Sequence, residues 1–482
     1  VAAPPSSIGK FGGDTDNWIW PRHTGDFSMF RVYASKDNHP AAYSPQNVPY
    51  RPKKHFSIST KGVKEGDFTM IYGFPGNTQE YILSDAVAYI AERSDPAKIA
   101  IRTGRLDIIT KAQESDPALR IHYAAKHASI ANAWKKWQGE ALGIDRRGTV
   151  AAKFDYETQF GLWSVGRPEY AGVVMGLRAE YDRIMDAYFA YEITRETLST
   201  LPAAYTPEER AEECFARRKF AEQALWRHAF REYGRCPKVY RTPSYAEGMA
   251  RYKSPEAYAD ALFEAVWEGS DSVAMQPAVR LREETKRMLD HISWMLGTKS
   301  LRNLNSKILN ELYTTYIKGL REWDRERAFY PDANLTLRVA YGSVAGYEYA
   351  DGEYHKPQTT LDGIIAKDNP EIYDYDIPQS LRDLYASKNY GRWGTVIDGR
   401  RTVPVCFLAT NHTTGGNSGS PVLNAGGELI GINFDRTWRS TMSDIAFDPA
   451  ICRNIAVDIR YVLFVVDRVG GAGYLLKEMT LK

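Results

Sequence analysis

The stretch "TTGGNSGSPVLNAGGELIGINFDRTWRS", residues 413–440, places one serine among glycines and continues as a predicted β-hairpin. A nucleophilic serine needs an exposed hydroxyl, with backbone N–H groups aimed at the developing oxyanion, and tight turns of this kind use glycine at positive φ. Gly416, Ser418 and Gly419 meet that need. A hairpin turn at residues 425–427 would anchor the segment on a β-barrel wall. The alternative is an ordinary glycine-rich turn.

The bulk properties of the chain exclude several classes of function. Its 482 residues include 62 Lys and Arg against 60 Asp and Glu, so no broad basic field favours nucleic acid. No apolar run is long enough to cross a bilayer, so we expect no membrane insertion. We also expect no metal and no cofactor, because the cysteines lack C-x-x-C spacing. Disulfides and buried thiols both remain open for Cys214, Cys236, Cys406 and Cys452.

Three segments with different hydrophobic periodicities follow one another. Residues 1–82 are typical of short strands, 83–330 of long helices, and 331–482 of strands followed by an amphipathic helix. The order predicts an α+β fold in which one β structure is split by a large helical insertion. The start lacks an initiator Met and a signal segment, so we expect a mature or truncated piece of something longer. The strands predicted in the first segment are residues 27–34, 55–60 and 68–76.

Two motifs carry a resemblance to a known family. "GNSGSPV", residues 416–422, followed by "GELIGI", resembles the nucleophile segment of chymotrypsin-fold serine peptidases. "GGDTDNWIWPRHTGDFSMFRVYA", residues 12–34, is similar to the aspartate segment of one bacterial branch, the dipeptidyl-peptidase 7 and 11 family. The resemblance implies a double β-barrel, with a helical domain inserted to cap the active site and the N-terminal part of the first barrel missing here. It also implies an exported, periplasmic homodimer that acts on peptides with a free N-terminal amine.

The resemblance implies roles for the catalytic residues. Ser418 matches the nucleophile and Asp26 the carboxylate that orients the base, while the N–H groups of Gly416 and Ser418 would form the oxyanion hole. The family's histidine precedes the aspartate, in a segment this chain does not contain, so we expect the catalytic His to be absent from the chain. His23 lies three positions from Asp26 and is a poor substitute. His412 is expected to line the substrate pocket or the core.

The resemblance also implies a site for the substrate's N-terminal amine. The matching positions are Asn17, Trp18, Asn132 and Asp435. Without the family, Asp435 would be interpreted as half of a surface salt bridge. Asn132 shares a predicted apolar stripe with three residues, so a buried hydrogen bond between helices is its alternative role. That stripe consists of Ile121, Ala125 and Ala128.

The residue after Asp435 implies the substrate preference. At this position the broad-specificity branch of the family has glycine, and the acid-specific branch, the dipeptidyl-peptidase 11 type, has arginine. Arg436 would therefore bind an acidic side chain at the second substrate residue, since a guanidinium pairs with a carboxylate in a two-pronged geometry. Asp435 and Arg436 should point opposite ways because side chains alternate along a strand. Arg439 is the alternative candidate.

These observations favour an acid-specific serine dipeptidyl-peptidase. A broad-specificity dipeptidyl-peptidase or an endopeptidase on the same fold is the second hypothesis, against which the amine-binding set and Arg436 both argue. A non-catalytic peptide-binding fragment is the third, and the absent histidine favours it. A histidine-bearing segment upstream in the complete gene product would separate the first hypothesis from the third.

Overall fold

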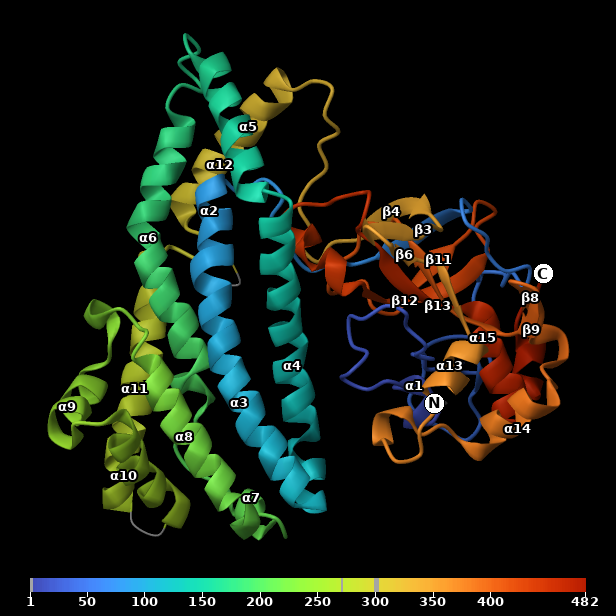
Figure 1. Cartoon of the computed structure of the whole chain (residues 1–482), viewed down its shortest axis with the longest axis horizontal. Coiled ribbons are helices and arrows are strands. Elements are labelled where there is room, and N and C mark those ends of the chain that lie inside the picture. Colours follow the sequence, from blue (N-terminus) through green and yellow to red (C-terminus); the bar gives the residue numbers. More distant parts are fainter. Residues whose placement is uncertain (1–2, 270–271, 299–302) are drawn as a thin grey trace. The chain divides into compact units, whose positions relative to one another are not determined.

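The computed structural model describes residues 3–269, 272–298 and 303–482, and these form two compact units (Figure 1). The first, here the β unit, combines Val1–Glu80 with Asp332–Lys482. The second, the helical unit, is Tyr81–Pro331. The chain therefore enters the helical unit from one part of the β unit and returns to the other part. The fold is mixed α+β.

The β unit is built on one curled seven-stranded sheet. Its order is β4-β3-β11-β12-β13-β10-β7, and every neighbouring pair is antiparallel. β3 comes from the N-terminal part and pairs with β4 and β11 of the C-terminal part, so the two parts share one hydrogen-bonded sheet. The strands are β1 (Tyr33–Ala34), β2 (Val48–Pro49), β3 (Phe68–Gly73), β4 (Arg338–Ser343), β5 (Tyr347–Ala350), β6 (Glu353–His355), β7 (Gln358–Thr360), β8 (Thr395–Ile397), β9 (Arg400–Thr402), β10 (Pro404–Ala409), β11 (Ser420–Leu423), β12 (Leu429–Arg436) and β13 (Asn454–Asp458).

One face of this sheet packs against the C-terminal helix to form the core of the β unit. β10 is buried along its whole length because it lies between β13 and β7 and is covered on both faces. Tyr461 and Phe464 of the helix "DIRYVLF" pack on it, beside Val405 and Val457. The helices of this unit are α1 (Ser6–Gly9), α13 (Leu361–Lys367), α14 (Gln379–Ser387) and α15 (Ile459–Phe464).

The helical unit has its own apolar core, which includes Tyr181, Ile184 and Phe230. Local signals set its helix boundaries. Asp116 caps one helix by accepting a hydrogen bond from the Ala118 N–H (2.8 Å), and the intervening proline suits a first helical position. The helices are α2 (Ser84–Ala88), α3 (Asp95–Ser115), α4 (Pro117–Arg146), α5 (Thr149–Ser164), α6 (Val173–Glu196), α7 (Pro207–Ala211), α8 (Lys219–Tyr233), α9 (Pro243–Tyr252), α10 (Pro255–Glu268), α11 (Ser272–Met295) and α12 (Lys307–Trp323).

Two predicted strands were wrong. Residues 27–34 form only the two-residue strand β1, paired with β2, and residues 55–60 make only isolated bridges at Ile58. Phe30 and Phe56 are exposed, while Phe27, Met29 and Ile58 contact the core, so these segments bury apolar side chains without forming the predicted strands. An alternating pattern becomes a strand only when a neighbouring strand supplies hydrogen bonds and a covering layer.

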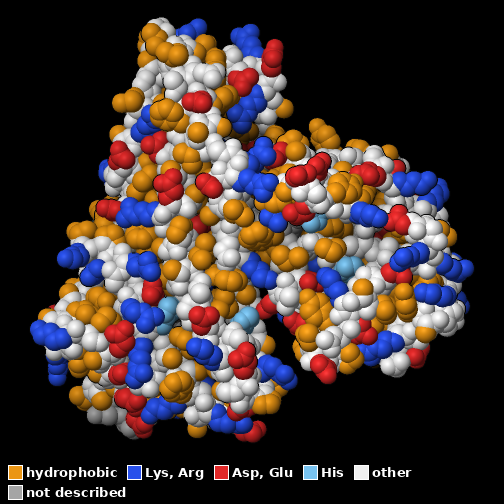
Figure 2. All heavy atoms as spheres, viewed as in Figure 1, with side chains coloured by type: hydrophobic (Ala, Val, Ile, Leu, Met, Phe, Trp, Pro, Cys, Tyr) orange, Lys and Arg blue, Asp and Glu red, His pale blue; other side chains and the backbone are white. Residues whose placement is uncertain are grey.

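The surface charges, the helices and the cysteines test three expectations drawn from the composition. Lys and Arg side chains are interspersed with Asp and Glu over the visible face (Figure 2). Among the described residues, none of the helices combines the length and apolar character needed to cross a membrane. The four cysteines are free thiols, and three of them are buried, which resolves the choice between thiols and disulfides.

Candidate active site

The turn that carries Ser418 is held open by glycine geometry and by one asparagine. Gly416 has φ +105° and Gly419 has φ +81°, and a Cβ on Gly416 would overlap the Phe74 carbonyl. Asn417 closes the turn because its Oδ1 accepts from the Thr414 N–H (3.0 Å) while its own N–H donates to the Thr414 carbonyl (3.0 Å). The turn therefore presents Ser418 to solvent in a fixed backbone conformation.

The hydrogen bonds around this turn leave two amide donors available. The N–H groups of Asn417, Gly419 and Ser420 all donate within the β unit. In the described part of the chain, those of Gly416 and Ser418 donate no hydrogen bond, and both residues are exposed. Two such donors beside a serine hydroxyl are the components of an oxyanion hole.

The Ser418 hydroxyl lies against the strand that carries the other predicted residues. Its Oγ donates to the Phe434 carbonyl (3.3 Å), and β11 pairs with β12 immediately after the turn. Asp435 and Arg436 follow Phe434 directly, so Arg436 lies about 7 Å along the strand from the carbonyl that Ser418 contacts. The hairpin thus brings nucleophile and specificity candidates together.

Asp435 joins two segments that are far apart in sequence. Its carboxylate accepts from the Trp18 N–H (3.2 Å) and forms an ion pair with Arg22 Nη1 (2.8 Å). Trp18 has φ +67°, and its carbonyl accepts from the Trp438 N–H (2.5 Å). The bland interpretation of Asp435 as half of a surface salt bridge is therefore wrong, because both side chains of this ion pair are below a tenth exposed.

Asp26 completes a group of three charges. It keeps contact with solvent, yet surrounding atoms desolvate its carboxyl and raise its pKa; Arg22 lowers that pKa and Asp435 raises it further. Two carboxylates with one guanidinium leave one net negative charge. That balance suits one substrate ammonium group.

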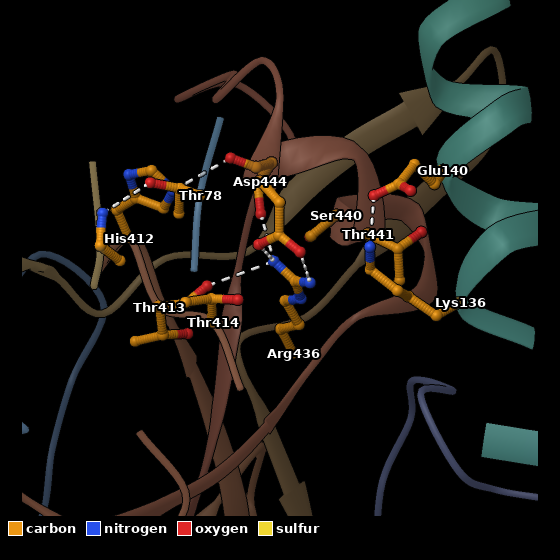
Figure 3. Close-up of polar contacts among 12 residues, drawn as sticks. Thr78, Lys136, Glu140, His412, Thr413, Thr414, Arg436, Ser440, Thr441 and Asp444 are labelled. Carbon is orange, nitrogen blue, oxygen red and sulfur yellow. Dashed lines mark hydrogen bonds and ion pairs between the residues drawn. The ribbon is translucent and has the colours of Figure 1, made fainter. Parts of the chain in front are cut away.

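Arg436 is buried and already has a carboxylate partner (Figure 3). Its Nη1 and Nη2 donate to the two oxygens of Asp444 at 2.6 and 2.8 Å, and Nη1 also donates to Ser443 Oγ (2.7 Å). Asp435 and Arg436 therefore have different ion-pair partners. Asp444 and Arg22 were not predicted as site residues: Asp444 lies outside the motifs, and Arg22 lies within residues 12–34 at a position to which no role was assigned.

Arg439 and Asn132 lie in different surroundings. The Arg439 guanidinium stacks on the Tyr349 ring at 3.7 Å and approaches Glu353 at 3.5 Å. Asn132 is exposed on α4, and Ile121 of the predicted apolar stripe is 79% exposed. The prediction that this stripe is buried was wrong, because α4 packs through larger side chains instead. These include Leu119, Tyr123 and Ile130.

Neither His23 nor His412 has the surroundings of a general base. Burial lowers the pKa of His23 to about 3, with help from Lys367 and Arg22, and its ring lies against Gly363. His412 has its Nε2 3.0 Å from the Ser443 carbonyl, and its ring stacks on Phe447. Burial lowers the pKa of His412 as well. His412 therefore packs beside the Arg436 and Asp444 pair, as expected for a pocket or core residue.

His23 makes folding stability dependent on pH. The unfolded chain protonates this histidine below about pH 6.5, whereas the folded chain does so only near pH 3, so stability falls as pH decreases through that interval. We expect the loss attributable to His23 to be roughly 2 to 3 kcal/mol between about pH 6.5 and about pH 4.5. Urea unfolding of wild type and His23→Leu measures it. Equal pH slopes for both proteins would contradict the expectation.

One group could in principle hold a metal. Ligand atoms of His122, Glu212 and Cys214 in the helical unit lie within 4.8 Å of one another. Arg218 Nη1 lies 2.7 Å from His122 Nε2 and 3.3 Å from Glu212, so a guanidinium already serves these acceptors. A cation would have to enter beside this fixed positive charge.

The chain is similar to known proteins in both sequence and fold. The profile of the peptidase S46 family matches residues 1–220 and 203–481. An Asp/Glu-specific dipeptidyl-peptidase of Capnocytophaga gingivalis is 42% identical over 100% of this chain and 72% of its own length. A dipeptidyl-peptidase 7 of Phocaeicola vulgatus is 35% identical with the same coverage. The crystal structure of Porphyromonas endodontalis DPP11 with the dipeptide Arg-Glu has a TM-score of 0.84 at 34% identity, covering 100% of this chain and 74% of that one.

The family match over nearly the whole chain and the shared fold together define the protein as a serine peptidase. The chain belongs to the peptidase S46 family of serine dipeptidyl-peptidases.

Proposed function

We propose that the protein releases N-terminal dipeptides from peptides and prefers Asp or Glu as the second residue. Ser418 attacks the scissile carbonyl, and the N–H groups of Gly416 and Ser418 stabilise the oxyanion. Asp26 orients the histidine base. Arg436 binds the acidic side chain. The observation that carries the proposal is the hydrogen bond from Ser418 to the strand that continues into Asp435 and Arg436.

The proposed amine site is the second support. Asp435 would bind the substrate ammonium together with Asn17 and Trp18, and Asn132 would contribute from the helical unit. The net negative charge of the Asp26, Arg22 and Asp435 group favours a cation at this position. An endopeptidase needs no such charge, so the site argues for an exopeptidase.

The finer architecture follows the family. In this proposal residues 1–82 belong to the first barrel of a chymotrypsin-like double β-barrel, 331–482 form the second, and 83–330 cap the active site. His23 is not the base in this proposal, because burial lowers its pKa too far for a general base. Periplasmic export and a homodimer complete the proposal, and cell fractionation and light scattering test them.

We expect strict dependence on the charged substrate amine. Acetylating the amine removes its charge and leaves Asp435 without its substrate partner, so kcat/KM should fall by roughly 30- to 1,000-fold. An N-methylated substrate, which keeps the charge, serves as the matched control and should retain most of the activity. Reporter dipeptides with the full-length enzyme provide the measurement. Efficient cleavage of the acetylated substrate would favour an endopeptidase.

A further inference from the structure

The ion pair between Arg436 and Asp444 is two-pronged. Asp444 takes the edge formed by Nη1 and Nη2, with one oxygen on each nitrogen. A guanidinium carries five N–H donors, so one arginine can serve a carboxylate of its own chain and one of a ligand.

Asp444 is held firmly by its surroundings. It ends the 3-10 helix η7 (Trp438–Asp444), and its carbonyl accepts from the Gln79 N–H (2.6 Å). The preceding carbonyl, of Ser443, lies 3.0 Å from His412 Nε2. The Arg436 guanidinium also contacts the Thr413 carbonyl (3.3 Å) and lies 5.6 Å from the centre of the Trp18 ring. The carboxylate and the guanidinium are both positioned before any ligand binds.

We propose that Asp444 is a specificity-determining residue, which positions Arg436 and lowers its net attraction for acidic substrates. This inference rests on the proposed function, in which Arg436 binds the acidic side chain. With Asp444 ionised, the Arg436 and Asp444 pair carries one positive and one negative charge and is neutral. A substrate carboxylate then gains the guanidinium but also lies close to a second carboxylate.

The two roles of Asp444 can be separated by one isosteric change. Asp444→Asn removes the charge but keeps an oxygen that can accept from Arg436, while Ser443 Oγ and the Thr413 carbonyl continue to hold Nη1. Orientation should therefore persist while repulsion disappears. The expected consequence is tighter binding of acidic ligands and weaker binding of neutral ones, because the buried guanidinium now lacks a charged partner.

The experiment compares the dipeptides Leu-Glu and Leu-Gln, whose second side chains differ in charge and little in shape. Titration calorimetry on the full chain gives Kd for each, and binding needs no catalytic turnover. In Asp444→Asn the ratio of Kd for Leu-Gln to Kd for Leu-Glu should rise roughly 10-fold over wild type. Asp444→Ser, which also removes the charge, should change the ratio in the same direction and serves if the first variant folds poorly.

Asp458→Asn is the matched control. Asp458 forms another buried two-pronged pair, with Arg460 at 2.9 and 2.6 Å, in the same unit. Its loss should destabilise the fold and leave the ratio unchanged. A ratio that is unchanged or reduced in both Asp444 variants overturns the proposal and leaves Asp444 a structural residue. A wild-type ratio of one instead overturns the acid preference itself, and this inference with it.

Discussion

Replacing Ser418 by alanine should abolish peptide hydrolysis by the full-length enzyme, with kcat falling about a million-fold, while dipeptides still bind. In the proposed mechanism Ser418 supplies the atom that forms the acyl-enzyme bond, whereas binding would depend on Asp435, Arg436 and the amide donors. Single-turnover kinetics with a reporter dipeptide measures the loss, and calorimetry measures the binding that remains.

Ser420→Ala is the appropriate control for that substitution. Ser420 is buried at the start of β11, with its N–H bonded to the Asn417 carbonyl, so its hydroxyl does not face solvent. We expect Ser420→Ala to retain turnover. If Ser418→Ala remained active and Ser420→Ala were inactive, the nucleophile would be Ser420 and not Ser418.

The second large effect concerns Arg436. Arg436→Gly should lower kcat/KM for Asp or Glu substrates by roughly 30- to 1,000-fold, equivalent to about 2 to 5 kcal/mol. This change also leaves the buried Asp444 carboxylate without its guanidinium partner. The gain for apolar substrates should therefore appear fully only in the double variant with Asp444→Asn, in which that unpaired charge is removed. Leu-Asp and Leu-Leu reporter substrates provide the comparison.

Two further variants check the assignment of Arg436. Arg436→Lys should restore only part of the acid preference, because an ammonium keeps the charge but loses the two-pronged geometry. Arg439→Gly should leave the ratio of acidic to apolar activity unchanged, since Arg439 stacks on Tyr349. A ratio that collapses in Arg439→Gly but not in Arg436→Gly would move the specificity role to Arg439.

Local sequence determined the features that depend on neighbouring residues. The positive φ angles of Gly416 and Gly419 and the hairpin after them are visible in the sequence, because only glycine adopts such angles without strain. The α+β class followed from periodicity, and a family motif identified Ser418 as the nucleophile candidate. The glycine inference needs only the backbone preferences of a short segment, the fold class needs the periodicity of the whole chain, and the role of Ser418 needs the family resemblance.

Only the tertiary structure decided which charges meet. Arg22 and Asp435 are separated by 413 positions, and Asp444 lies beyond the strand that carries Arg436, so no spacing rule could pair them. Tertiary structure also decided the conformation of residues 27–34, of which only Tyr33 and Ala34 form a strand. Ion pairs and strand pairs form when distant segments pack together, because packing buries the charged groups and the strands and excludes water. The sequence pattern shows that a charge or a strand is present, and packing decides its partner.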